Sequence, residues 1–237
     1  MAKSIANLKK ELRARADNNK AVQLQRFFKT GRGEYGEGDQ FLGVMVPQQR
    51  ALVKKYYAIL DLADCEKLLS SPWHEERLTA LLVLVAKFAR ADEKTRALIF
   101  RFYLTHTARI NNWDLVDLSA PRIVGSWLYK KDKTPIFRLA RSKTLWENRI
   151  AILAVFYDIG QGEFSCAMRL AEMFANDRRD LIQKADGWML REVHKRGGAQ
   201  IVEDFLQAHR QTMPRTMLRY AIERMSQEKR GHYLGRG

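Results

Sequence analysis

The stretch "ERLTALLVL", residues 76–84, places a basic residue ahead of apolar residues that recur with the period of a helix. This spacing predicts a helix with one strongly buried face. Related stretches follow at residues 148–156 ("NRIAILAVF"), 183–191 ("QKADGWMLR") and 214–222 ("PRTMLRYAI"). The chain is therefore expected to repeat one kind of helical unit.

The distances between these stretches give the length of the repeat. Arg77 and Arg149 lie 72 residues apart, which is twice 36, Lys184 follows 35 residues later, and Arg215 a further 31. A period of about 35–40 residues is typical of HEAT-like and armadillo-like solenoids, in which one helix of each pair lines a concave surface. The predicted fold is all-α, a superhelical α-solenoid of HEAT-like antiparallel helix pairs with a concave basic groove. Position 113, halfway between Arg77 and Arg149, should face the same groove.

Helical signals continue along the rest of the chain, and no convincing strand pattern interrupts them. An amphipathic stripe runs through residues 5–12. Ser71 and Asp180 are the expected N-caps of two later helices, and the glycines at 197–198 are expected to end one. Because no linker rich in Pro, Gly or Ser divides the sequence, a single domain over residues 1–237 is predicted.

The composition favours a folded protein that binds a polyanion. Forty-two Lys and Arg residues exceed twenty-seven Asp and Glu residues, which gives a formal net charge of +15, and 46% of the residues are hydrophobic. Such an excess attracts nucleic acid or an anionic membrane surface, although a basic surface can also serve solubility alone. Cys65 and Cys166 lie far apart and suit buried thiols in a reducing compartment. The five histidines form no metal-binding pair, so no metal site is predicted.

The sequence predicts a soluble cytoplasmic protein, in the cytosol or nucleoid of a bacterial-type cell. Residues 1–17 are amphipathic and charged, and they lack the apolar core and cleavage site of a signal peptide. The most apolar run, residues 78–86, is far shorter than the about 20 residues that a membrane-spanning helix needs. We expect no membrane association and a monomer.

Two motif-like segments do not predict the sites that they resemble. Residues 31–43 contain the spacing GxGxxG, but they follow a helix and bring in Glu34, Glu37 and Asp39, which repel phosphate. This segment is therefore predicted to be a loop between helices. The sequence "HEER" at residues 74–77 lacks the second histidine of a metalloprotease helix.

The stretch "NNWDLVDLSAP", residues 111–121, carries two acids beside a tryptophan in this basic chain. Trp113 and Asp117 share a helix face because they are four residues apart. Asp114 is rotated by about 100° and lies near the helix start, where a carboxylate caps or offsets the helix dipole. Asp117 could be an exposed acid or a salt-bridge partner. In a groove that binds DNA, one carboxylate also suits a transient positive charge, such as an oxocarbenium-like sugar.

Trp188 and Arg149 are further candidates for such a groove. Trp188 follows Gly187 in the middle of a helix, where glycine costs about 1 kcal/mol and often marks a close approach by a backbone or a ligand. Core packing is the alternative for this tryptophan. Arg149 is expected on the polar edge of an apolar helix, where it could bind the DNA backbone or only face solvent.

The sequence resembles the AlkD-like family of DNA alkylation repair glycosylases from about residue 23 to about residue 222. The resemblance is carried, in this order, by "RFFK", "FLGVMVPQQRALVK", "WDLVD", "LWENRIAIL" and "LIQKADGWMLRE". It implies a superhelix of HEAT-like helix pairs. It also implies hydrolytic excision of positively charged N3- and N7-alkylated purines from double-stranded DNA, without metal or cofactor.

The resemblance also assigns roles to individual residues. It implies that Asp117 stabilises the oxocarbenium-like sugar and positions water, beside the two sugar-contacting tryptophans. Those tryptophans match Trp113 and Trp188, the groove arginine that contacts the backbone at the lesion matches Arg149, and the aromatic from an early helix matches Phe27. Lys184 and Arg191 are also expected to bind DNA. Phe27 stands where a tyrosine is found in the family pattern, Asn112 replaces a tryptophan, and residues 45–46 replace a more polar pair. These departures bear on fine DNA contacts and lesion preference.

Three functions are compatible with these observations. A glycosylase would release alkylated purines with a single carboxylate, because a cationic base is already a good leaving group. A non-catalytic HEAT-repeat protein would bind DNA, with strong salt dependence, and release no base. A protein-interaction scaffold, a common use of α-solenoids, would bind little DNA at moderate salt.

Overall fold

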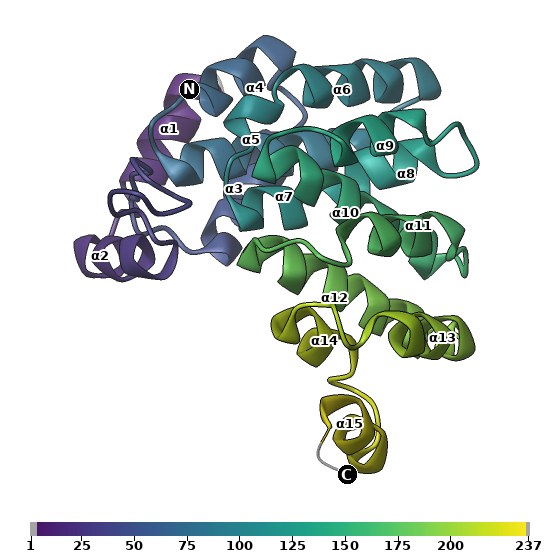
Figure 1. The fold of residues 1–237 in the computed structure, drawn as a ribbon. Coiled ribbons are helices and arrows are strands. Elements are labelled where there is room, and N and C mark those ends of the chain that lie inside the picture. The colour runs from purple at the N-terminus through teal and green to yellow at the C-terminus, as the bar shows by residue number, and fades with distance from the viewer. Residues whose placement is uncertain (1–3, 236–237) are drawn as a thin grey trace. The chain divides into compact units, whose positions relative to one another are not determined.

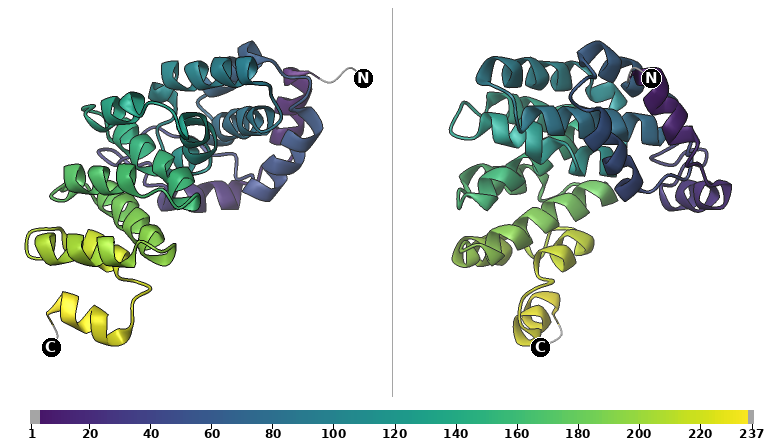
Figure 2. Two further views of the ribbon diagram at one scale, coloured as in Figure 1. Left: turned by 90° about the vertical axis from the view of Figure 1, so that its right-hand side faces the viewer. Right: turned by 180° about the vertical axis from the view of Figure 1, so that it is seen from behind.

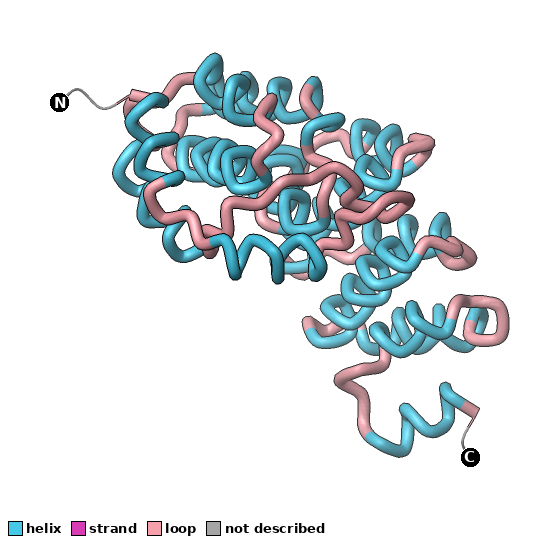
Figure 3. Tube along the Cα trace, turned by 90° about the vertical axis from the view of Figure 1, so that its left-hand side faces the viewer, coloured by secondary structure: helices cyan, strands magenta, loops and turns pink. Residues whose placement is uncertain are grey.

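The computed structural model describes residues 4–235, and over these residues the fold is helical (Figure 3). The only extended pairing that it records there is an isolated bridge between Gln40 and Trp73. The all-α prediction is confirmed. The chain divides into two compact units, residues 1–123 and 124–237. The single domain over residues 1–237 stays a prediction, and its two ends, residues 1–3 and 236–237, lie outside the described residues.

The first unit contains seven α-helices within the described residues (Figure 1). They are α1 (Ile5–Arg13), α2 (Asn18–Phe27), α3 (Val46–Tyr56), α4 (Leu62–Leu69), α5 (His74–Phe88), α6 (Glu93–Thr105) and α7 (Trp113–Asp117). A 3₁₀ turn at Thr107–Arg109 precedes α7, and a π-helical turn at Pro121–Gly125 follows it. Side chains of Ser4, Asp17, Asp61 and Asp92 cap α1, α2, α4 and α6.

Helix α5 is the centre of the first unit, because every residue from His74 to Leu84 is buried. α3, α4, α6 and α7 all pack against it. Its predicted cap is wrong: Trp73 holds the N-cap position without a side-chain bond, and the Ser71 hydroxyl accepts a hydrogen bond from the Trp73 N–H at 3.1 Å instead. The polar residues that begin α5 are engaged by neighbouring segments, as described below.

The second unit contains α8 (Ser126–Leu128), α9 (Thr134–Ala140), α10 (Leu145–Gly160), α11 (Ser165–Phe174), α12 (Asp180–Lys195), α13 (Ala199–His209), α14 (Arg215–Ala221) and α15 (Gln227–Leu234). Helices α9 and α11 pack beside α10 and α12, and α10, α12 and α14 pack in succession (Figure 1). This is the neighbour pattern expected of stacked helix pairs. The HEAT assignment and the groove stay predictions.

Gly187 permits the closest of these packings. A Cβ atom added to it would lie 2.5 Å from the Met217 carbonyl oxygen and 2.7 Å from the Tyr220 Cβ, both on α14. The expected close approach is therefore that of another helix. Asp180 is the first residue of α12 and Arg179 is its N-cap, so the predicted cap is off by one residue. The predicted stop at residues 197–198 is confirmed, since α12 ends at Lys195 and Gly197 has a positive φ of 104°.

The last helix, α15, lies at the C-terminal end of the second unit, beyond α13 and α14 (Figure 2). Its Lys229 is bound to Glu203 on α13 at 2.6 Å. Both cysteines are buried, as expected, and burial raises the pKa of Cys65 to about 12 and that of Cys166 to about 11. None of the helices between residues 4 and 235 combines the length and apolarity needed to cross a bilayer.

Candidate active site

Helix α7 begins at Trp113 because Asn112 caps it. The Asn112 Oδ1 accepts a hydrogen bond from the Trp113 N–H at 2.8 Å, and the Nδ2 donates to Asp39 Oδ2 at 3.2 Å. Asn112 is completely buried. The residue that replaces a tryptophan of the family pattern is therefore built into the interior of the first unit, where it joins α7 to the loop before α3.

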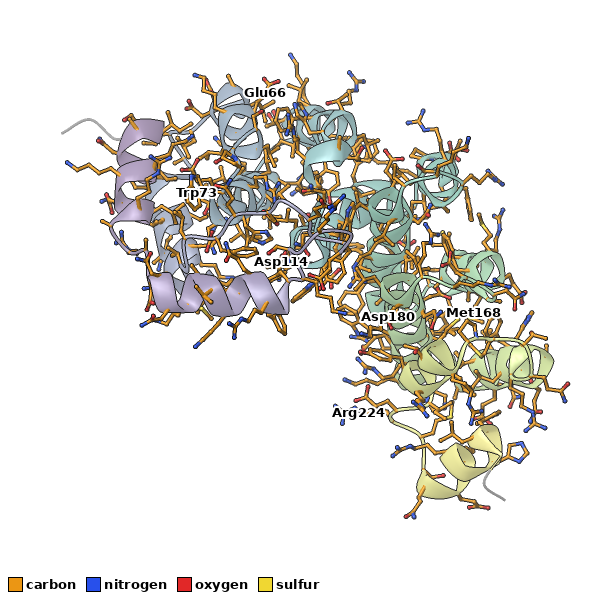
Figure 4. All side chains as sticks on the ribbon, turned by 60° about the vertical axis from the view of Figure 1, so that its left-hand side comes forward. Glu66, Trp73, Asp114, Met168, Asp180 and Arg224 are labelled. Atoms are coloured by element: carbon orange, nitrogen blue, oxygen red, sulfur yellow. The ribbon has the colours of Figure 1, made fainter. Side chains whose placement is uncertain are left out.

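Asp114 does more than support its own helix. Its Oδ1 accepts a hydrogen bond from the Leu115 N–H at 2.8 Å, as a first-turn acid can, but its Oδ2 accepts one from His74 Nε2 at 2.8 Å. Asp114 is 6% exposed and lies inside the first unit (Figure 4). The predicted role in its own helix was incomplete, because a partner 40 residues away cannot be read from local spacing.

His74 links two carboxylates. Its Nδ1 lies 2.7 Å from Asp39 Oδ2, while its Nε2 bonds Asp114. Both acceptors need a donor, so the geometry requires a doubly protonated imidazolium. Burial works to lower the pKa of His74, but the charges and hydrogen bonds of Asp114 and Asp39 outweigh it and raise this pKa to about 9. Sequence reasoning tested "HEER" only as a metal motif and missed this role.

Arg77 is the partner that completes the charge balance around Asp39. Its Nη2 donates to Asp39 Oδ1 at 2.6 Å, and the residue is buried. The repeat pattern placed Arg77 with the basic residues that face the groove, which is wrong for this position. Its guanidinium is held in the interior because Asp39 neutralises it there.

Glu75 and Glu76 complete the buried start of α5. The Glu75 carboxylate accepts hydrogen bonds from the N–H groups of Leu42, Gly43 and Val44 at 2.9, 2.8 and 3.1 Å. Glu76 pairs with Lys9 and Arg13 of α1, at 2.9 and 3.1 Å. Residues 74–77 therefore fasten α1, the loop before α3, and α7 around α5.

The loop at residues 31–43 is a loop, as predicted, and its acids satisfy its own backbone. The Gly31 and Gly33 N–H groups donate to Glu34 and Glu37, each at 2.8 Å. Asp39 binds His74 and Arg77. The carboxylates of this segment are therefore bound to groups of the protein. The glycines here serve turns, since Gly33 has a positive φ of 79°.

A column of rings supports Trp113. Its indole stacks on Phe28 with centroids 4.9 Å apart and planes 12° apart. Phe28 stacks on Phe41 at 5.0 Å, and Phe41 stacks on the His74 ring at 4.4 Å. Phe27, which is 63% exposed, meets Trp113 edge-on at 5.7 Å. The structure thus brings together two predicted site residues, Phe27 and Trp113, on a rigid aromatic base.

Asp117 ends α7, four residues after Trp113, so the two side chains share a face of this helix. Both residues are half-buried. The Tyr103 hydroxyl, which bonds the Ser119 hydroxyl at 2.9 Å, lies within the electrostatic influence of Asp117. Burial raises the pKa of Tyr103 above its usual range, and the Asp117 charge adds to this rise while Ser119 opposes it. Asp117 is therefore a carboxylate at the edge of the core.

Arg149, in the second unit, is not on a solvated face. It is 5% exposed, and its Nη1 donates to the Leu181 carbonyl at 2.6 Å. The expectation of a polar-edge arginine is wrong, because the guanidinium turns inward and donates to a backbone carbonyl in the first turn of α12, which links α10 to α12.

The other second-unit candidates all lie on α12. The Trp188 indole N–H donates to Glu192 Oε1 at 3.3 Å, and its ring is tilted against Phe156 at 5.6 Å. Lys184 pairs with Asp180 at 2.7 Å, and Arg191 pairs with Glu223 on α14. Both cations therefore carry acidic partners at the surface, where such pairs are weak enough to exchange for phosphate.

Asp186, next to Gly187 and Trp188, is a buried acid that sequence reasoning missed. Burial, helped by the nearby charge of Asp177, raises its pKa to about 8. Its Oδ2 has no hydrogen-bond partner within the described part of the chain. The side chain is therefore a neutral carboxylic acid at moderate pH.

We expect Asp186→Asn to stabilise the protein selectively at alkaline pH. The folded carboxyl binds its proton more tightly than the unfolded one, so wild-type stability falls as pH rises from the ordinary value of 3.8 towards about 8. Urea unfolding at about pH 5 and about pH 8 measures the effect. The variant's advantage should grow between these values by on the order of 1–4 kcal/mol. An advantage that is the same at both pH values would contradict this account.

Two comparisons with known proteins gave matches, one that shows the family and one that shows the fold. The model of the family described as DNA alkylation repair enzyme matches residues 8–225. A solved structure described as a predicted DNA alkylation repair enzyme from Enterococcus faecalis has a TM-score of 0.69 to this chain at 16% identity, covering 90% of this chain and 98% of that one. No curated protein sequence matches.

Proposed function

Because this chain belongs to the family of DNA alkylation repair enzymes, we propose that it is a DNA glycosylase. In this proposal it hydrolyses the N-glycosidic bond of positively charged N3- and N7-alkylated purines in double-stranded DNA. The observation that supports it most directly is Asp117, a half-buried carboxylate on the same short helix as Trp113, in a chain of net charge +15.

The reaction needs one carboxylate close to the positive charge that forms on the sugar while the glycosidic bond breaks. As the bond between the sugar and the cationic base breaks, positive charge moves from the base to the sugar, and Asp117 stabilises it. The same carboxylate orients the water whose oxygen bonds to the sugar carbon, and the proton that this water loses is released to the solvent. The departing base takes the bonding electron pair and becomes neutral, so it needs no proton from a general acid.

Trp113 and Phe27 are proposed to contact the sugar and backbone at the lesion. The exposed Phe27 and the half-buried Trp113 offer aromatic surface beside each other, and their ring column limits their movement. A fixed platform aids catalysis because little reorganisation is needed when the transition state forms.

The second unit is proposed to supply DNA contacts through α12. Lys184 and Arg191 would exchange their acidic partners for backbone phosphates, and Trp188 would pack against a sugar. Arg149, which is buried, is proposed to support contact with the DNA backbone indirectly, by holding the first turn of α12 in place through its hydrogen bond to the Leu181 carbonyl.

The test is base release from methylated double-stranded DNA by the wild-type protein. We expect chromatography to detect free 3-methyladenine or 7-methylguanine, at rates well above spontaneous loss. Binding should weaken linearly with the logarithm of salt concentration. DNA binding without base release at any salt concentration would overturn the glycosylase and favour a non-catalytic DNA-binding protein. Failure to bind DNA at moderate salt would favour the scaffold function instead.

A further inference from the structure

Both neighbours of Trp113 are anchored to one buried cluster. Asn112 donates to Asp39, and Asp114 accepts from His74, which also bonds Asp39. The two anchors lie on either side of the Trp113 backbone, so the start of α7 is fixed at two points. The cluster also reaches the indole, because the His74 ring stacks on Phe41 at the far end of the ring column.

We propose that the imidazolium of His74 is a positioning residue, which fixes the start of α7 and thereby orients Trp113 and Asp117. The proposal rests on the glycosylase function for its catalytic consequence. The orientation of Trp113 by His74 does not depend on that function. His74 is too deeply buried to touch DNA, so any effect on catalysis must pass through the protein, by way of α7 or of the ring column beneath Trp113.

The proton on the ring is essential to this role. A neutral imidazole has one N–H and one lone pair, whereas both ring nitrogens here face carboxylate oxygens. Loss of the proton therefore removes a hydrogen bond and sets a lone pair against a carboxylate. If the bond to Asp114 is lost, α7 is released directly. If the bond to Asp39 is lost, Asp39 is held less firmly, and Asp39 is the residue that binds the Asn112 side chain.

The surrounding charges leave His74 as the only cation bound to Asp114 among the described residues. Arg77 stays bound to Asp39 through its other oxygen, and Arg109 acts electrostatically on Arg77. Glu75, beside His74 on α5, is occupied by three backbone N–H groups. Of the groups around the imidazole, Asp114 therefore depends most on the proton of His74 for its hydrogen bond.

The first experiment follows the wild-type protein from about pH 6 to about pH 10, on the alkaline side of an ordinary histidine. NMR would record the imidazole signals of His74 and the indole N–H of Trp113, the latter assigned with Trp113→Phe. We expect the Trp113 signal to shift at the same pH at which His74 loses its proton. Single-turnover base release should fall at that pH, while DNA affinity changes by less than about threefold.

Asp114→Asn provides the readout that a merely structural role would not give. Asparagine removes one negative charge from beside the imidazolium, and, with its oxygen on the Leu115 N–H, it turns an NH2 donor towards His74 Nε2, where only the neutral ring can accept a hydrogen bond. An opposite charge in contact shifts a pKa by about 1–3 units, so the His74 titration should move to lower pH by about one unit or more. The Trp113 shift and the loss of base release should then no longer occur at the wild-type pH. Asp39→Asn serves as the second variant, and Asp92→Asn, at the exposed cap of α6, is the matched control.

The outcomes separate this proposal from the proposed function. If the Trp113 signal does not respond while His74 titrates, His74 does not position α7. The same conclusion follows if the loss of base release stays at one pH in Asp114→Asn and Asp39→Asn. If the wild type releases no base at all, the glycosylase function fails, yet the coupled NMR titration still decides whether His74 orients Trp113.

Discussion

Asp117→Asn should lower single-turnover base release from methylated DNA by at least about a hundredfold, the usual loss when a group that stabilises developing charge is removed. Asparagine has nearly the same shape but cannot offset the positive charge on the sugar. DNA binding should persist or tighten, because the variant removes a carboxylate that repels phosphate. Folding should be preserved, since a negative charge at the end of α7 opposes the helix dipole. Chromatography of released bases and a gel-shift titration measure the two effects.

The control for this experiment is Asp204→Asn, which removes an exposed acid from α13 in the second unit. It makes the same change in net charge as Asp117→Asn. It should keep the wild-type rate of base release, because Asp204 is not one of the proposed site residues. Near-normal release by Asp117→Asn would assign the chemistry to another group. A loss of release together with a loss of DNA binding would instead indicate a binding role for Asp117.

Glu75→Ala should reduce the free energy of unfolding by about 3 kcal/mol or more. The substitution leaves three N–H groups, those of Leu42, Gly43 and Val44, without their acceptor. Hydrogen bonds to a charged group contribute about 1.5–3 kcal/mol each, and the loop recovers part of this by admitting water. Urea unfolding monitored by circular dichroism gives the difference.

Glu75→Gln is the informative intermediate, because its single carbonyl oxygen can accept from some of these groups but carries no charge. It should fall between the wild type and Glu75→Ala. Glu228→Ala, at the exposed start of α15, should change stability by less than about 0.5 kcal/mol. A loss in Glu75→Ala no larger than that of Glu228→Ala would show that the loop does not depend on the carboxylate.

The helices could be predicted from the sequence because apolar periodicity is a local property. That α5, α10 and α12 are helices follows from apolar spacing within single stretches, and the stop at residues 197–198 follows from glycine chemistry. The single buried face expected of the repeat does not hold for α5 and α10, which are buried on all sides over residues 74–84 and 148–155. Placing Trp113 and Asp117 on one face needed only their separation of four residues.

The polar interior could not be predicted in the same way. Asp39, His74 and Asp114 are separated by 35 and 40 residues, and no local pattern says that they meet. Arg77 and Arg149 look like other basic residues that begin apolar helices. Whether such an arginine faces solvent or turns inward depends on an acceptor on another segment, which is Asp39 for one and the Leu181 carbonyl for the other.

The two carboxylates that bind His74 also limit how this chain can change over evolutionary time. Asp39, His74 and Asp114 are buried together with Arg77, and the two acids and two cations balance one another's charge, so replacing any one alone leaves a buried charge without its counterpart. A lineage that loses the histidine is expected to alter both acids as well. The three positions should therefore be inherited or exchanged as a set, although no two of them lie on the same helix.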